Sequence, residues 1–249
     1  MLFKLNNNIP YTAIAEIYDY MLRHVDYQQW YEFISTIMIN YIDNPRTVLE
    51  LGCGTGKFGA KFSADDFKIT GLDLSLEMLM VAKTRAYRNF RIVCADIRRF
   101  AVKKKFDFIF SVHDTMNYML TEEDVSRVLR CTREAMHSES IFLFDITTEN
   151  NIKKFFDNKT SFYKTRGILA EWSNRYDKKK KSVISSFRIT LPDGSVKEEE
   201  HIQRIYSVKE ITEILGKEGF EILDIFGDYS TIPPGDETIM INFITKKRD

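Results

Sequence analysis

Apolar runs and stretches of helical periodicity alternate along the first 150 residues. Residues 11–40 carry apolar side chains at helical spacing, with a break near 24–27. Short apolar runs rich in β-branched and aromatic residues then predict five strands, at 48–51, 67–73, 90–94, 106–112 and 141–145. Helical patterns separate most of them, at 57–63, after Ser75 and at 121–136. Strands that alternate with helices predict an α/β fold, with a mainly parallel sheet that helices cover on both faces.

The pattern changes after the fifth predicted strand. Residues 168–176 and 183–191 are predicted strands joined by a lysine-rich hairpin turn, and a Leu-Pro-Asp-Gly-Ser turn leads into an alternating strand that ends at Tyr206. A helix at 208–219 and strands at 220–226 and 238–245 then restore the α/β order. We therefore expect a Rossmann-like domain (1–146 and 207–249, with 1–42 as a helical flap) and an inserted small antiparallel β-sheet (147–206) that covers the substrate.

A glycine-rich loop follows the first predicted strand. Gly52, Gly54 and Gly56 alternate there, and glycines let another group approach the backbone closely. A dinucleotide fingerprint, Gly54-x-Gly56-x-x-Gly59, begins two residues too late after the strand. Glu50, at the strand end, would repel a pyrophosphate and attract a cationic amine. The loop therefore favours S-adenosylmethionine, which has an amino group and a sulfonium but no phosphate, over NAD; an ordinary strand-to-helix turn is the remaining alternative.

Acidic residues end the second and third predicted strands. Asp73 is placed to accept hydrogen bonds from both ribose hydroxyls. Leu74 and Met78 follow it and form either an apolar slot for adenine or part of the core. Asp96 is a candidate acceptor for the adenine amino group with Ile97 against the ring, and a turn cap is the alternative.

These motifs resemble the class I S-adenosylmethionine-dependent methyltransferases. The resemblance rests on Val-Leu-Glu-Leu-Gly-Cys-Gly-Thr-Gly at 48–56, Gly-Leu-Asp-Leu-Ser-Leu-Glu-Met-Leu at 71–79, and Ala95-Asp96. The opening Tyr-x-x-x-Ala-x-x-Tyr-Asp at 11–19 and Asn117-Tyr118 resemble the small-molecule branch, which includes glycine N-methyltransferases and amino-sugar N,N-dimethyltransferases. The resemblance implies a seven-stranded mixed sheet whose last strand is antiparallel. It also implies cofactor contacts from Glu50, Gly52, Gly54, Asp73, Asp96 and the segment after the fourth strand, with Ser111 and Val112 at that strand's end. Tyr11 and Tyr18 either lie over the cofactor as an aromatic lid or pack the helices onto the sheet. Cys53 fills the glycine loop, and Leu74, Met78 and Ile97 complete the expected cofactor site.

Candidate acceptor-site residues follow the fourth strand and lie on the last strand of the insertion. His113, Asn117 and Tyr118 come directly after a strand end, where open α/β sheets bind ligands. Strand alternation places His201 and Gln203 on one face, and we expect this face to point inward. An amine acceptor needs little base assistance, whereas a hydroxyl acceptor needs a base, for which the two histidines are candidates. A purely structural histidine is the alternative at either position.

Charge and cysteine content restrict the partners. The 249 residues contain 36 Lys and Arg and 36 Asp and Glu, so the net charge is zero, which argues against a nucleic-acid partner. The lysine runs at 103–105 and 178–181 favour RNA only weakly, because both suit solvated turns. Three widely spaced cysteines indicate a reducing compartment and neither a disulfide framework nor a metal site.

These observations together predict a cytoplasmic, monomeric or homodimeric enzyme. No apolar run approaches the roughly 20 residues of a membrane span, and the N-terminus lacks a signal-peptide core. The expected reaction is transfer of a methyl group from S-adenosylmethionine to a small-molecule acceptor, preferably at an amine nitrogen. RNA methylation, with tRNA as the acceptor, and non-catalytic binding of S-adenosylmethionine are the alternatives.

Overall fold

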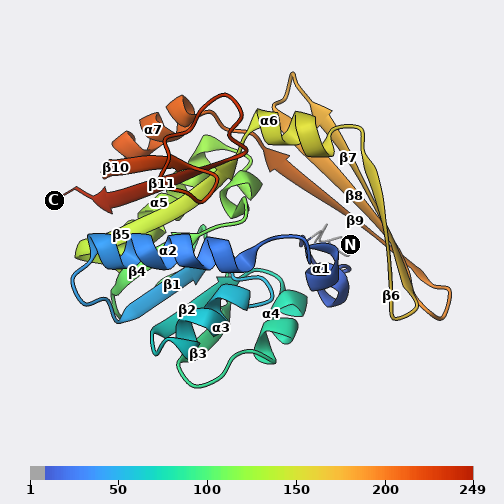
Figure 1. The fold of residues 1–249 in the computed structure, drawn as a ribbon, viewed down its shortest axis with the longest axis horizontal. Coiled ribbons are helices and arrows are strands. Elements are labelled where there is room, and N and C mark those ends of the chain that lie inside the picture. Colours follow the sequence, from blue (N-terminus) through green and yellow to red (C-terminus); the bar gives the residue numbers. More distant parts are fainter. Residues whose placement is uncertain (1–8, 249) are drawn as a thin grey trace, which may run out of the picture.

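The computed structural model describes residues 9–248 and contains two β-sheets (Figure 1). The expectation that the N-terminus lacks a signal-peptide core concerns residues 1–8, which lie outside the described residues. The first sheet has the strand order β10-β11-β5-β4-β1-β2-β3. Its strands are β1 (Thr47–Leu51), β2 (Lys68–Asp73), β3 (Phe90–Cys94), β4 (Phe106–Ser111), β5 (Met136–Thr147), β10 (Phe220–Gly227) and β11 (Met240–Lys247). β11 is antiparallel to both neighbours and the other pairs are parallel, which confirms the predicted mixed seven-stranded sheet.

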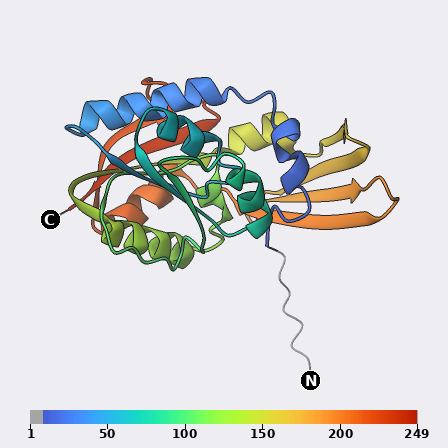
Figure 2. The same cartoon turned by 90° about the horizontal axis from the view of Figure 1, so that it is seen from below.

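Helices cover both faces of this sheet, as predicted (Figure 2). One face carries α2 (Tyr27–Tyr41) and α3 (Lys57–Ala64), and the opposite face carries α5 (Glu122–Ala135) and α7 (Val208–Lys217). Phe108 and Phe110 pack on the first side and Ile109 on the other, so β4 is buried on both faces. This explains why its sequence reads as a continuous apolar run.

Side-chain caps fix where several helices begin. Ser75 accepts a hydrogen bond from the Met78 backbone at the start of α4 (Leu76–Lys83), as its sequence position predicts. Ser207 and Glu210 form a complete capping box at the start of α7. Asp26 caps α2 and so separates it from α1 (Ala15–Met21), which confirms two N-terminal helices.

The second sheet is antiparallel and has four strands in sequence order. They are β6 (Thr160–Thr165), β7 (Ile168–Asp177), β8 (Ser182–Thr190) and β9 (Val196–Arg204), and α6 (Glu149–Asn151) and the π-helical turn η2 (Ile152–Phe156) precede them. This sheet projects from one end of the molecule (Figure 1). The sequence pattern did not indicate β6, because this edge strand is mostly exposed and lacks an alternating apolar face; its Phe162 is 75% exposed.

Helix α1 joins the second sheet to the rest of the molecule. Ile14, Ile17 and Met21 pack on the apolar side chains of β7 and β8, which include Ala170 and Phe187. α1 also contacts α4 of the main domain. Among residues 9–248, no helix combines the length and the apolar character that a membrane crossing requires.

Gly59 in α3 is a position that the packing restricts to glycine. A Cβ there would lie 2.2 Å from Cζ of the buried Phe90, and several other atoms of that ring lie nearly as close. We expect Gly59→Ala to cost at least about 2 kcal/mol, because the core must be overpacked. In α7, Gly216→Ala should be neutral or stabilising, since no atom lies within 4 Å of the added Cβ. Thermal unfolding of both variants checks this; equal melting temperatures would contradict it.

Candidate active site

A cavity of about 350 Å³ lies at the carboxyl ends of β1, β2 and β4. The glycine loop and Asp73 form its floor, and residues from η1 (Thr115–Tyr118), α2 and the chain before α1 close over it. This is the edge at which parallel α/β sheets bind ligands, because the loops that follow the strands meet there.

The glycine loop is held against β2 in a conformation that requires glycine. The backbone amides of Gly52 and Cys53 both donate to the carbonyl oxygen of Leu72, at 2.8 and 2.9 Å. Gly52 has a φ of +78°, and a Cβ on it would lie 2.6 Å from Cγ2 of Thr115. Gly54 lines the cavity, and without a side chain its backbone is open to a ligand there.

Two carboxylates flank this loop. Glu50 is 3% exposed, lines the cavity, and its Oε2 has no hydrogen-bond partner. Burial, with a smaller contribution from the charge of Asp73, raises the pKa of Glu50 well above its ordinary value. Asp73 accepts hydrogen bonds from Gly54 N at 2.7 Å and Ser75 N at 2.9 Å, and burial raises its pKa as well. The site is therefore one that a cationic ligand group stabilises.

S-adenosylmethionine fits these residues. Its amino group would supply the partner that the buried Glu50 lacks, and its ribose hydroxyls would suit the remaining lone pairs of Asp73. Leu74, which is 39% exposed, and the buried Met78 and Ile97 offer apolar surface for the adenine ring. A pyrophosphate would place negative charge beside two buried carboxylates.

Asp73→Ala should weaken S-adenosylmethionine binding by about 1.5–3 kcal/mol, the range of a hydrogen bond to a charged group. The variant also removes the acceptor for Gly54 N, so the loop itself is loosened. Calorimetric titration measures the dissociation constant, and Asp73→Asn, which retains one carbonyl acceptor, should fall between the two. An unchanged dissociation constant in a folded Ala variant would exclude Asp73 from the site.

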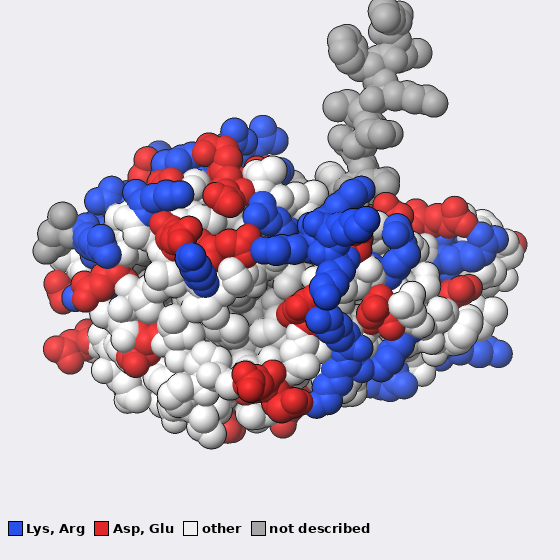
Figure 3. Space-filling model, turned by 90° about the horizontal axis from the view of Figure 1, so that it is seen from above, with Lys and Arg blue, Asp and Glu red and all other residues white. Residues whose placement is uncertain are grey.

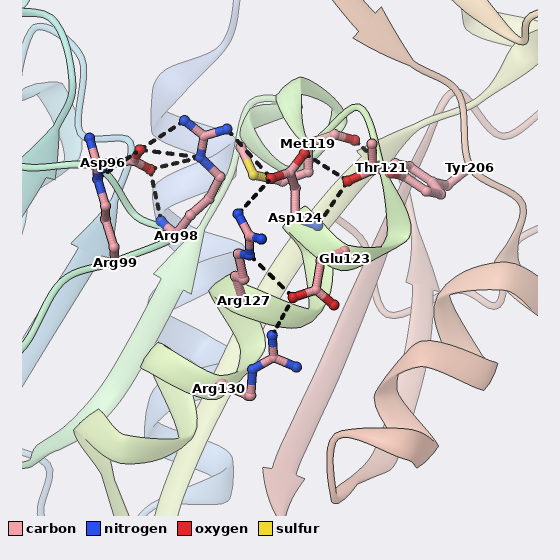
Figure 4. Close-up of polar contacts among 10 residues, drawn as sticks. All are labelled: Asp96, Arg98, Arg99, Met119, Thr121, Glu123, Asp124, Arg127, Arg130 and Tyr206. Atoms are coloured by element: carbon pink, nitrogen blue, oxygen red, sulfur yellow. Dashed lines mark hydrogen bonds and ion pairs between the residues drawn. The ribbon is translucent and has the colours of Figure 1, made fainter.

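Asp96 lies at the edge of the cavity in a network of ion pairs (Figure 4). Its Oδ1 accepts from the Arg98 backbone at 2.9 Å, so it does cap a turn, and its carboxylate pairs with the side chains of Arg98 and Arg99. Although burial alone would raise the pKa of Asp96, the bonds from Arg98 lower it overall. Arg98 extends the network to Asp124 of α5. A bond to adenine would share this carboxylate with two arginines, and this role stays a prediction.

The first helix is tied to the glycine loop by Asp19. Its carboxylate accepts from Thr55 Oγ1 at 2.8 Å and from the Arg85 guanidinium at 2.5 Å, and Lys57 lies 3.6 Å away. Arg85 also donates to the carbonyl oxygen of Thr55. Asp19 therefore holds α1 against the glycine loop through the buried Thr55 and through the cations Arg85 and Lys57.

Tyr11 connects the main domain to the second sheet. Its carbonyl accepts from Ser75 Oγ at 3.2 Å, while its backbone amide donates to Glu199 of β9. The Tyr11 and Tyr118 hydroxyls are 2.6 Å apart, and the Tyr118 hydroxyl lies 3.1 Å from Nδ1 of His201. The opposite nitrogen of His201 contacts Glu199, so one continuous chain of hydrogen bonds links β9 to the cavity wall.

The turn after β4 has an unusual backbone. His113 and Asp114 both adopt left-handed conformations, with φ of +63° and +53°. Asp145, at the end of β5, accepts from both backbone amides at 2.7 and 2.8 Å and from the Tyr229 hydroxyl. Burial lowers the pKa of His113 to about 4, with Lys57 adding to the effect, so this cavity-lining imidazole is neutral at pH 7.

The structure gathers most, but not all, of the predicted site residues at the cavity. The lining includes Tyr11, Tyr18, Glu50, Gly52, Cys53, Gly54, Asp73, Leu74, Met78, Asp96, Ile97, Val112, His113 and Tyr118. Ser111 lies beneath it, fully buried, with its hydroxyl bonded to the Leu51 carbonyl. Asn117 is also fully buried; it donates to the Arg204 carbonyl and accepts from Thr147 N, so it joins η1 to both sheets.

The inward orientation expected for the His201 face agrees with the burial along β9. His201 and Gln203 are 2% and 9% exposed. Glu200, which precedes them, and Ile202, which lies between them, are both exposed. His201 reaches the cavity through Tyr118 and is not part of its lining.

Sequence reasoning missed Asp145, Tyr229 and Glu199. An acid at the end of β5 occupies the same kind of position as Asp73 at the end of β2, and this signal was available. Glu199 precedes His201 by two residues and so shares its face. Tyr229 lies in the loop after β10 without a local signal, and only tertiary packing brings it to Asp145.

Comparisons with known proteins agree with this geometry. A family model described as a methyltransferase domain matches residues 48–139. The putative methyltransferase YqeM of Bacillus subtilis is 26% identical over 243 residues, which cover 95% of this chain and 97% of that protein. A dTDP-4-amino-2,3,4,6-tetradeoxy-D-glucose N,N-dimethyltransferase of Saccharopolyspora spinosa is 31% identical over 118 residues, 47% of each chain.

A solved structure is also similar over nearly the whole chain. The S-adenosylmethionine-dependent methyltransferase from Clostridium acetobutylicum superposes with a TM-score of 0.82 at 26% identity, covering 96% of this chain and 99% of that one. The fold, the glycine loop and the unpartnered carboxylate beside it all fit the cofactor that this name states. The protein is a class I S-adenosylmethionine-dependent methyltransferase.

Proposed function

We propose that the protein methylates an amine nitrogen of a small molecule. The observation that carries the proposal is the aromatic wall of the cavity, formed by Tyr11, Tyr18 and Tyr118, with His201 and Glu199 bonded behind Tyr118. Aromatic faces favour a cationic group, and a cavity of about 350 Å³ suits a metabolite better than a folded macromolecule.

The weakness of the two histidines as bases supports an amine over a hydroxyl acceptor. His113 lines the cavity, but its lowered pKa makes it a poor proton acceptor at neutral pH. His201 is buried, with both ring nitrogens in contact with Tyr118 and Glu199. A neutral amine has its own lone pair for attack and does not need a strong base. The relative from Saccharopolyspora spinosa, whose name states an N,N-dimethyltransferase of an amino sugar, agrees with this choice.

Catalysis then consists mainly of positioning. S-adenosylmethionine, when bound, supplies a methyl group on a sulfonium sulfur, which an amine lone pair can take by direct displacement. Tyr11 and Tyr18 close the cavity and exclude water, and Asn117 fixes η1 against both sheets. Tyr118, bonded to His201 and through it to Glu199, offers a route for the proton that the methylated nitrogen releases. In this proposal, residues 147–206 form the layer that selects the acceptor.

The test described below also includes RNA as an acceptor. On the face shown in Figure 3, lysines and arginines form a band, with acidic side chains interspersed around it. Such a band on a chain of zero net charge gives little general attraction for RNA.

The test is transfer of a labelled methyl group from S-adenosylmethionine to matched acceptors. Amino sugars and amino alcohols are compared with the same compounds in which a hydroxyl replaces the amine, and with bulk tRNA. We expect label only in amines. Label in the hydroxyl compounds or in tRNA alone would contradict the proposal, and binding without transfer to any acceptor would identify a non-catalytic binding protein.

A further inference from the structure

Contacts from other elements hold the backbone of Asp114 in an unusual conformation. Its backbone, with that of His113, is held in the left-handed region by the carboxylate of Asp145. Such a conformation in two successive non-glycine residues is costly and persists only where surrounding contacts enforce it. The Asp145 oxygens are engaged by two amides and the Tyr229 hydroxyl, so Asp145 holds the turn without using the side chain of Asp114.

The Asp114 carboxylate has no cationic partner. Among residues 9–248, no Lys, Arg or His nitrogen pairs with it within 4.0 Å, whereas Asp19, Asp96 and Glu199 near the same cavity each pair with at least one such side chain. Its polar contact is the neutral amide of Gln203 on β9. Asp114 is partly accessible and is not itself among the residues that line the cavity, but its neighbours His113 and Thr115 line it, which places Asp114 beside that space.

Aromatic side chains complete the surroundings of this carboxylate. Burial is the main cause of the raised pKa values of Tyr11, Tyr18 and Tyr118, and the negative charge of Asp114 adds to it in all three, so Asp114 is near each of them. These tyrosines also line the cavity and, like Asp114, are partly accessible. Burial and the charge of Asp145 raise the pKa of Asp114 itself to about 7, as expected where a counter-ion is missing.

We propose that Asp114 binds the acceptor nitrogen as its counter-ion, with the three tyrosines as aromatic walls and Gln203 as a neutral hydrogen-bonding neighbour. The proposal rests on the proposed amine acceptor and narrows it to small primary or secondary amines that become cationic on methylation. When the nitrogen–carbon bond forms and the carbon–sulfur bond breaks, positive charge passes from sulfur to nitrogen. A fixed carboxylate beside the nitrogen stabilises that developing charge.

A second cation, the sulfonium itself, could also be served by a carboxylate, but the position of Asp114 favours the acceptor. Glu50 and Asp73 flank the glycine loop, where the cofactor is expected. Asp114 instead contacts Gln203 of the second sheet. The experiment therefore separates the two cations.

The test uses choline and 3,3-dimethylbutan-1-ol, which have the same shape and differ in charge. Calorimetry measures their binding to the full-length protein saturated with S-adenosylhomocysteine, whose sulfur is uncharged. We expect the wild type to prefer choline by about tenfold or more, Asp114→Asn to lose this preference, and Glu200→Gln, an equal charge change on the exposed face of β9, to retain it. Equal binding of the two probes to the wild type, or an unchanged preference in Asp114→Asn, would overturn the proposal.

A second measurement assigns the charge. The affinities of Asp114→Asn for S-adenosylmethionine and S-adenosylhomocysteine should keep the wild-type ratio; a selective loss for the sulfonium would overturn the proposal in favour of a cofactor role. These experiments also distinguish a failure of the Asp114 site from a failure of the proposed amine methylation. Amine methylation together with an unchanged choline preference in Asp114→Asn rejects only the Asp114 site. A choline preference that depends on Asp114, without amine methylation, rejects only the proposed reaction.

Discussion

Replacing Glu50 by Gln is expected to weaken S-adenosylmethionine binding by about 10- to 150-fold, the equivalent of about 1.5–3 kcal/mol. Glu50 is almost completely buried, and its Oε2 lacks a partner in the protein. A ligand ammonium supplies this partner, and glutamine replaces the charged acceptor by a neutral group. The same substitution should raise the melting temperature of the free protein, because it removes a buried charge that burial and Asp73 disfavour.

Calorimetric titration and thermal unfolding of the ligand-free protein check both parts. Glu139→Gln is the matched control, since Glu139 is exposed and takes part in no ion pair among the described residues. It should change neither affinity nor melting temperature. A Glu50→Gln variant that binds S-adenosylmethionine as tightly as the wild type would show that the amino group binds elsewhere.

The ligand-free protein should lose stability as the pH rises from 6.5 to 8, and Asp114→Asn should reduce this loss. Burial, with the charge of Asp145 as a further cause, raises the folded-state pKa of Asp114 to about 7, and burial raises that of Asp145 to about 7. Because these values lie above the unfolded values near 4, the folded state holds protons that the unfolded state has already released. The stabilisation from the bound protons is full below the unfolded pKa and is lost as the pH rises through about 7.

His113 acts in the opposite direction, but in another pH range. Its folded pKa of about 4 lies below the ordinary 6.5, so its contribution is lost as the pH falls through that interval. Above pH 6.5 it is mostly neutral in both states, and the window from 6.5 to 8 reports largely on the carboxyl groups. Asp114→Asn should therefore be more stable than the wild type at pH 8 by about 1–2 kcal/mol, or about 2–8 °C.

Chemical denaturation at pH 6.5, 7 and 8 measures this difference, with Glu200→Gln as the control for an exposed charge. Equal stability of Asp114→Asn and wild type at pH 8 would show that the Asp114 carboxylate carries no such penalty. A variant that gains stability and loses the choline preference would identify Asp114 as a residue retained for binding at the expense of the fold.

That the glycine loop and Asp73 meet at one cavity was predictable, because the signals are local. Gly52, Gly54 and Asp73 stand at fixed distances from strand ends, and the ends of parallel strands necessarily meet at one edge of the sheet. The surroundings of His113 and His201 were predicted less well. Glu199, Asp145 and Tyr229 come from separate elements, and their sequence neighbours give little indication that they meet.

The sequence by itself determined the α/β order, the cap of α4, the glycine loop, and the alternation that places His201 and Gln203 on one face. These features depend on backbone periodicity and on side chains within a few residues of one another. Only the tertiary structure decided that Asp96 is paired with arginines, that Asn117 joins the two sheets, and that Asp114 lacks a cation. Burial and charge pairing arise when distant segments pack together, so a linear pattern of residue types does not contain them.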